Sequence, residues 1–183
     1  LTAAHCTMDP PLFGKVSFGT TVAAPPRLVA VTASVVDPGS DLRLAKLAVP
    51  VRDVAPVPLN TTPLGSAEVG GAIRHVGFGL DAYPKGGLAD TKRHVSLVVG
   101  QILGEELIFA SADGGSGVCF GDSGGPGLMR IGGSPDEVLV GVASSLVSEP
   151  SCYAAALDVR VDAFSTWIAE VSAVWELQSC EAG

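Results

Sequence analysis

Gly121-Asp122-Ser123-Gly124-Gly125-Pro126 is the stretch that decides the fold of this 183-residue chain. A serine between glycines suits a tight turn that exposes its hydroxyl group, and glycines let backbone N–H groups approach a substrate oxygen closely. A G-x-S-x-G pattern also occurs at the nucleophile elbow of α/β-hydrolases, which needs a strand–turn–helix context. The residues around Ser123 are instead rich in glycine and strand-like. The stretch therefore indicates a nucleophilic serine in a β-rich chain.

Two upstream segments could supply partners for this serine. Leu1-Thr2-Ala3-Ala4-His5-Cys6 contains a histidine, although a lone histidine is more often structural than catalytic. In the segment from Asp37 to Leu47, Asp41 enters an apolar run, and a carboxylate buried there needs a partner such as an imidazole. Asp37 and Asp53 are rival carboxylates, and the residues alone do not choose among the three.

Alternating apolar and polar residues predict short strands. The period of two is clearest in Leu28 to Val36, and it recurs in Val95 to Val99 and in Glu137 to Ala143. Ala72 to Phe78 is a weaker case. The segment from Pro56 to Gly71 is rich in Pro, Gly, Thr and Ser, so we expect it to connect two halves of the chain.

One helix is predicted near the end of the chain, with Asp162 as its N-cap. Its apolar stripe, with residues three or four positions apart, consists of Phe164, Trp167, Ile168, Val171, Val174 and Trp175. Such a stripe packs one face of the helix against the body of the protein. We expect an all-β body, a helix from 162 to 176 and a tail from 177 to 183.

Composition excludes several classes of protein. With 47% hydrophobic and 16% charged residues the chain is not expected to be disordered. The net charge of -8 comes without any basic cluster, which argues against a nucleic-acid partner. No stretch reaches the roughly 18 apolar residues of a membrane helix. The four cysteines are scattered, so we expect disulfides in an oxidising compartment rather than zinc, and no cofactor.

Together the motifs resemble the trypsin-like (chymotrypsin-fold) serine protease family. The T-A-A-H-C motif stands at Thr2 to Cys6, and G-D-S-G-G-P stands at Gly121 to Pro126. The run D-L-R-L-A-K-L from Asp41 is similar to the D-I-A-L-L-K-L of the family. The resemblance implies two antiparallel six-stranded β-barrels, the first incomplete, with the C-terminal helix after them. We expect the first barrel in 1–62 and the second in 63–161.

The resemblance also implies the roles of the site residues. His5, Asp41 and Ser123 would form a catalytic triad in the cleft between the barrels, with the N–H groups of Gly121 and Ser123 as the oxyanion hole. In the family, Asp122 pairs with an ammonium group that zymogen cleavage releases. We expect this chain to lack its natural start, with Asp122 unpaired or re-paired and little activity in the isolated chain.

The cysteines and the specificity pocket are interpreted through the same resemblance. Cys119 and Cys152 match the bridge beside the pocket, Cys6 matches a bridge with an upstream partner, and Cys180 has no counterpart. The residues expected to line the substrate site are Gly117, Phe120, Ser144, Leu146 and Ala156. Gly117 stands at the base of the pocket, where preference for Arg or Lys requires an Asp. We therefore expect cleavage after small or medium apolar residues.

The expected partners are protein or peptide substrates and protein inhibitors of proteases. We expect a monomer, secreted or periplasmic, made as a zymogen. The alternative is a catalytically silent, protease-like binding or adaptor domain, although such domains usually replace a triad residue. An esterase of another fold is a third hypothesis. His75 and His94 lie in strand-like segments, where a structural role is expected.

Overall fold

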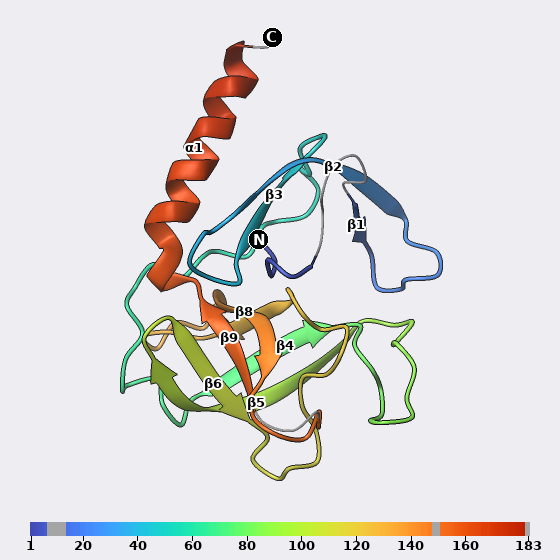
Figure 1. Ribbon diagram of the computed structural model, residues 1–183, viewed down its shortest axis with the longest axis vertical. Coiled ribbons are helices and arrows are strands. Elements are labelled where there is room, and N and C mark those ends of the chain that lie inside the picture. Colours follow the sequence, from blue (N-terminus) through green and yellow to red (C-terminus); the bar gives the residue numbers. More distant parts are fainter. Residues whose placement is uncertain (7–13, 148–150, 182–183) are drawn as a thin grey trace.

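The computed structural model describes residues 1–6, 14–147 and 151–181 of the chain. Within these ranges the chain forms two β-sheets, a short 3₁₀ helix and an α-helix (Figure 1). The expected all-β body with a C-terminal helix is confirmed. The strands are β1 Lys15–Phe18, β2 Arg27–Val36, β3 Arg43–Leu47, β4 Ala72–Gly77, β5 Arg93–Leu103, β6 Glu106–Ala110, β7 Pro126–Met129, β8 Val138–Leu146 and β9 Ala156–Arg160; the helices are η1 Asp162–Phe164 and α1 Ser165–Glu181.

The larger sheet is a closed barrel of six strands in the order β4-β5-β6-β9-β8-β7. Neighbouring strands pair antiparallel around the whole barrel. Alternate residues point inward, as the period of two predicts. The interior is filled by apolar side chains with at most 2% of their surface exposed, among them Ile73, Leu97, Val99, Leu107, Phe109 and Val140. Because every strand is paired on both sides, the barrel has no edge strand and can hold its loops rigidly.

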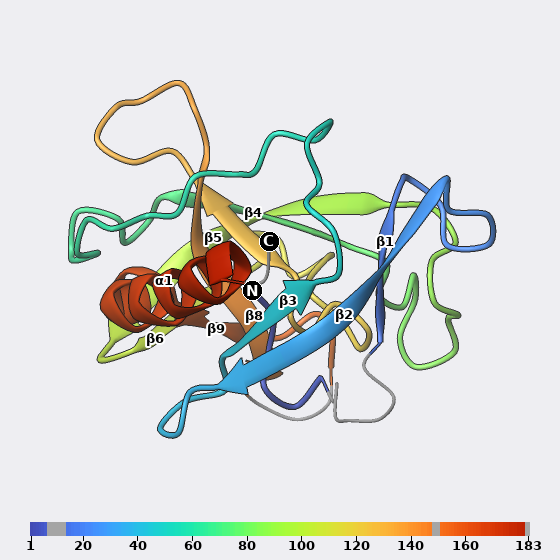
Figure 2. The ribbon, with the colours of Figure 1, turned by 90° about the horizontal axis from the view of Figure 1, so that it is seen from above.

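The smaller sheet contains β1, β2 and β3 in that order, all antiparallel. Val29 and Val31 of β2 are each 3% exposed, whereas Val35 and Val36 near its end are exposed. A bulge between Val31 and Ala33 shifts the register against β3. Seen from above, β2 and β3 lie across the barrel (Figure 2). An isolated bridge between Thr2 and Arg43 attaches the first residues of the chain to this sheet.

One apolar cluster joins the smaller sheet, the barrel and the C-terminal helix. Its buried members are Ala3, Leu42, Leu44, Val142, Val159, Val161, Phe164 and Ile168. They come from the first residues of the chain, β3, β8, β9 and the helices, so the two sheets share one core. Burying such side chains contributes roughly 1.5–3 kcal/mol for each large one. The cluster fixes the first six residues against the barrel.

The start and the end of the helix differ from the prediction. Asp162 is not an N-cap, because its carboxylate accepts hydrogen bonds from Leu64 N at 2.9 Å and from Arg160 Nε at 3.2 Å. Bonds to a guanidinium are charge-assisted and outcompete a cap. The helix also continues to Glu181, so residues 177–181 are helical rather than part of a tail. No helix in the described ranges has the length and apolar character needed to cross a bilayer.

Candidate active site

The imidazole of His5 and the carboxylate of Asp41 meet where the small sheet lies against the barrel. His5 Nδ1 lies 2.7 Å from Asp41 Oδ2, and the His5 backbone N–H donates to Oδ1 at 2.9 Å. Ser144 Oγ donates to Oδ2 at 2.6 Å. Partial burial alone would raise the pKa of Asp41, but the bonds from Ser144 and His5 outweigh it and lower the pKa. Asp41 therefore stays ionised and can orient the imidazole.

Arg43 anchors the segment that carries His5. Its backbone pairs with Thr2, through Thr2 N to Arg43 O at 2.9 Å and Arg43 N to Thr2 O at 2.8 Å. Its side chain is buried and donates to Ser34 Oγ at 2.8 Å and to Ala4 O at 3.1 Å. The arginine of the D-L-R-L motif thus ties the T-A-A-H-C motif to β3. This explains how Asp41 and His5, far apart in sequence, become neighbours.

The rival carboxylates bond elsewhere. Asp37 Oδ1 accepts the N–H of Gly39 at 3.0 Å, closing a local turn. Asp53 Oδ1 accepts Arg27 Nη1 at 2.6 Å on the surface. Within the described part of the chain, neither carboxylate is hydrogen-bonded to His5. The geometry therefore favours Asp41, the residue that the resemblance chose.

The turn that carries Ser123 packs directly against the first residues of the chain. Gly124 has a φ of 76°, in the left-handed region, and a Cβ there would lie 2.1 Å from Thr2 Oγ1 and 3.0 Å from Ala3 N. Gly124 N–H also donates to Ala143 O of β8 at 2.7 Å. Glycine is required because no side chain fits between the turn and the N-terminal segment. This contact places His5 and Ser123 on the same side of the molecule.

Of the hydrogen bonds among the described residues, none joins the His5 ring to Ser123 Oγ. Such bonds are often long in free enzymes and shorten when substrate binds. The neighbouring Cys6 contacts the same turn, since its Sγ lies 3.5 Å from Ser123 O. The two motifs are thus adjacent.

Two backbone N–H groups beside the Ser123 hydroxyl have no acceptor within the described part of the chain. They belong to Gly121 and to Ser123 itself. Gly121 has a φ of 93°, a conformation that other residues rarely adopt. The intervening Asp122 N–H is used differently and donates to Cys119 O at 3.0 Å. Free donors in this arrangement can bind a developing oxyanion.

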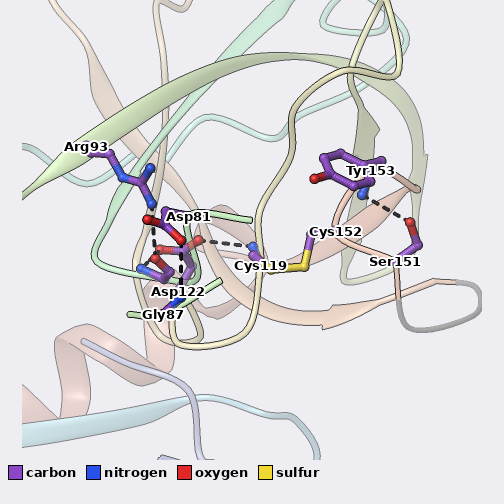
Figure 3. The surroundings of a disulfide bond; sticks show 9 residues. Asp81, Gly87, Arg93, Cys119, Asp122, Ser151, Cys152 and Tyr153 are labelled. Carbon is purple, nitrogen blue, oxygen red and sulfur yellow. Dashed lines mark hydrogen bonds between the residues drawn. A yellow bond between two sulfur atoms is a disulfide. The ribbon is translucent and has the colours of Figure 1, made fainter. Parts of the chain in front are cut away.

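The Asp122 carboxylate is held by backbone donors. Oδ1 accepts the N–H of Gly79 at 2.7 Å. Oδ2 accepts the N–H of Cys119 at 3.0 Å (Figure 3). A Cβ on Gly77 would lie 2.0 Å from Oδ1, and one on Gly79 would lie 2.3 Å from Oδ2, so both glycines make room for the carboxylate. Asp122 is therefore paired with main-chain groups. A disulfide between Cys119 and Cys152 secures the same region.

A small cavity of about 40 Å³ opens beside Ser123. Of the residues expected to bind substrate, Phe120, Ser144 and Leu146 line it. Gly117 and Ala156 do not. The carbonyl of Cys152 occupies the space beside Gly117, where a Cβ would lie only 1.9 Å from that oxygen. Ala156 is buried in the barrel core, opposite Leu146 and Phe109 in the sheet.

The role of the Ser144 hydroxyl was missed by the sequence reasoning, which placed this residue in the substrate-binding strand only. Its partner Asp41 lies 103 positions earlier in the sequence. A serine in a strand gives no local signal of such a distant partner. Only the packing of the two sheets reveals it.

Comparisons with known proteins identify the family. The sequence model of the trypsin family, described as Trypsin, matches residues 1–168. Among solved structures, the fold is similar to neuropsin, a serine protease expressed in the limbic system of mouse brain, with a TM-score of 0.77 and 21% identity over 93% of this chain and 83% of that chain. A comparison with curated proteins finds no match. Since the family match spans most of the sequence, the chain belongs to the trypsin family of serine proteases.

Proposed function

We propose that the chain is a serine endopeptidase that cleaves peptide bonds through an acyl-enzyme intermediate on Ser123. Ser123 Oγ attacks the substrate carbonyl carbon while His5 Nε2 takes its proton, and Asp41 stabilises the imidazolium. The N–H groups of Gly121 and Ser123 donate to the oxyanion. His5 then protonates the leaving amine, and water attacks the ester by the same route in reverse.

One observation carries this proposal more than the others. The His5–Asp41 pair, at 2.7 Å, sits on a segment that packs directly against the Ser123 turn. A histidine with an oriented tautomer beside a glycine-flanked serine is the arrangement that activates a weak hydroxyl nucleophile. The free N–H donors next to the same serine supply the second requirement of acyl transfer.

The proposal is tested by pre-steady-state kinetics with a chromogenic ester. An acyl-enzyme predicts a burst of released alcohol equal to the concentration of active sites, followed by slower turnover. Ser123→Ala serves as the matched variant and should abolish the burst while leaving the fold intact. A full-length, activated protein that shows no burst and no hydrolysis would favour the catalytically silent binding role.

We further propose a preference for small or medium apolar residues before the scissile bond. The cavity beside Ser123 is small, and the side chains that line it, including Val118, Phe120 and Leu146, carry no charge. Leu146→Gly should widen it and raise the ratio of kcat/KM for Phe over Ala substrates by roughly 10- to 200-fold, the range that a change in apolar pocket contacts produces. An unchanged ratio, or a profile dominated by Arg or Lys, would contradict this specificity.

The remaining parts of the proposal concern the setting of the enzyme. The Cys119–Cys152 disulfide supports a secreted or periplasmic protein, since such bonds persist in oxidising compartments. The two sheets support a division into halves at 1–62 and 63–161, with the candidate site between them. We propose a monomer made as a zymogen, acting on proteins and controlled by protein inhibitors. Cell fractionation and measurement of the mass in solution test these points.

A further inference from the structure

His75 and Asp158 form a buried pair inside the barrel that the proposed mechanism does not use. His75 belongs to β4 and Asp158 to β9, and His75 Nε2 lies 2.9 Å from Asp158 Oδ2 and 3.1 Å from Oδ1. Asp158 has no exposed surface and His75 is 5% exposed. Within the described residues the carboxylate has no other recorded hydrogen-bond donor. His75 is therefore the group that satisfies a fully buried carboxylate.

The barrel is shaped around this pair. A Cβ on Gly127 would lie 2.1 Å from Asp158 Oδ2, and one on Gly141 would lie 2.3 Å from the same atom. The His75 ring stacks on Phe109 with 4.3 Å between ring centres. Burial raises the pKa of Asp158 and lowers that of His75 to about 4. The sequence thus keeps two ionisable groups, and two glycines that admit them, where an apolar core would avoid the desolvation penalty.

The pair is connected to the Ser123 turn through β4. Gly77 follows His75 by two positions, so the two residues share one face of the strand, about 6.6 Å apart. The position of a Gly77 Cβ is 2.0 Å from the Asp122 carboxylate, which also accepts the Gly79 N–H. His75 and Asp122 line one cavity of about 500 Å³. His75 Nδ1 is buried and has no hydrogen-bond partner among the described residues.

We propose that Asp158, acting through His75, is a positioning residue for the oxyanion-binding turn from 121 to 123. The hydrogen bond across the barrel fixes β4, the end of β4 holds the Asp122 carboxylate, and Asp122 links the two oxyanion donors. Loss of the bond would let the end of β4 shift and loosen the turn. The inference rests on the proposed function, because it assigns a role in the same site.

The surroundings of the pair predict how its charge acts. Among the residues that contact the pair, Phe109 of β6, Gly127 of β7 and Gly141 of β8 carry no charge. The charged or titratable side chains outside the disulfide that line the cavity with His75 are Asp81, Tyr83, Arg93, His94, Asp122 and Tyr153. Burial favours the net-neutral pair. Raising the pH through the elevated pKa of Asp158 removes one proton and leaves a negative charge on this carboxylate, which contacts His75 of β4. Repulsion between this charge and the Asp122 carboxylate loosens the turn.

Three variants of the protein test this inference. Asp158→Leu removes the bond, Asp158→Asn keeps an oxygen acceptor without the charge, and Arg74→Met is the control. Arg74 lies next to His75 in β4 but pairs with Glu137, so its loss weakens the same strand without touching the buried pair. The readouts are hydrogen exchange of the Gly79 backbone amide and the rate at which a fluorophosphonate labels Ser123, both measured from neutral to alkaline pH.

Asp158→Leu should speed exchange at Gly79 and slow labelling of Ser123, each by about tenfold or more. Asp158→Asn should match the unsubstituted protein at neutral pH and lose its alkaline decline in labelling. Arg74→Met should change neither rate. The inference is overturned if Asp158→Leu leaves both rates unchanged, or if Arg74→Met alters them equally.

If Asp158→Leu does not fold, the alkaline comparison decides, and a decline that persists in Asp158→Asn overturns the inference. An unsubstituted protein that is never labelled refutes the proposed enzyme function. Hydrogen exchange at Gly79 distinguishes a failure of the Asp158 inference from a failure of the proposed enzyme function. It reports whether Asp158 holds the turn whether or not the protein is active.

Discussion

Gly124→Ala should disable the site by separating its two motifs. The new Cβ would lie 2.1 Å from Thr2 Oγ1, 3.0 Å from Ala3 N and 3.3 Å from Cys6 Sγ. Because Ala3 N is a backbone atom, the segment itself must move, and it carries His5. Gly133→Ala is the matched control, since Gly133 has a φ of 79°, close to the 76° of Gly124, and nothing within 4 Å of its Cβ position.

The expected loss of folding free energy differs between the two variants because only the Cβ at position 124 meets other atoms. Alanine in the left-handed region costs roughly 1–2 kcal/mol, and this is the whole expected loss in Gly133→Ala. Gly124→Ala adds roughly 1–3 kcal/mol for overpacking, giving about 2–5 kcal/mol. A shift of about 1 Å in His5 lowers kcat/KM by roughly 100-fold. Gly133→Ala should leave kcat/KM unchanged.

Urea denaturation measures the free energy of unfolding of both variants, and ester hydrolysis at a temperature where both are folded measures kcat/KM. The reasoning would be refuted if Gly124→Ala were no less stable and no less active than Gly133→Ala. Equal losses in the two variants would mean that only the backbone conformation matters. The contact between the turn and the first residues of the chain would then have no role.

Three further predictions concern the supports of the site. Asp41→Asn should lower kcat by about 10⁴-fold, the drop typical of this change in a Ser-His-Asp triad, because the amide favours the wrong imidazole tautomer; stopped-flow kinetics measures it. In the folded protein the pKa of Asp41 lies below its ordinary value of 3.8. The ionised Asp41, bonded to His5 and Ser144, therefore adds to the free energy of unfolding above that pH, and this contribution is lost as the pH falls through the lowered pKa. Ser144→Ala removes a hydrogen bond that lowers this pKa, so acid unfolding followed by circular dichroism should begin at higher pH, and an unchanged acid midpoint would contradict the assigned contact. Replacing both Cys119 and Cys152 by alanine opens a loop spanning 33 positions and should cost about 3–4 kcal/mol of folding free energy in the loop-closure account; thermal unfolding tests this, and an unaltered Tm would speak against it.

Local patterns predicted the elements that depend on local physics. The alternation in Leu28 to Val36 became β2, and the patterns near 72, 95 and 137 lie in β4, β5 and β8. The apolar stripe of the last helix also packs as expected, with Phe164 and Ile168 in the shared core. These features follow from period and burial, which the sequence displays directly.

Contacts with residues that are distant in the sequence could not be predicted from local patterns. Ser144 was predicted to bind substrate through its strand, and nothing near it indicated a bond to Asp41. Asp162 had the residue type of an N-cap, but Arg160 and Leu64 N take its carboxylate. The helix continues to Glu181, and Glu176, Leu177 and Gln178 are all good helix formers.

The specificity pocket shows the same limit. Counting six positions back from Ser123 gave Gly117, yet the Cys152 carbonyl lies beside that residue. The cavity at Ser123 is lined by the predicted Phe120, Ser144 and Leu146 but not by Gly117. His75 was expected to be structural, and its buried partner Asp158 was not foreseen. Spacing along the chain identified the motifs, whereas the contacts between strands determine which side chains meet.

The triad is tested most directly by covalent labelling with a fluorophosphonate. Mass spectrometry of peptides shows which residue is labelled and whether labelling requires His5. We predict one adduct, on Ser123, and the loss of that adduct in His5→Ala, because Ser123 needs the Asp41-oriented imidazole to become nucleophilic. An adduct on another residue, or labelling of Ser123 that proceeds equally fast in His5→Ala, would contradict it.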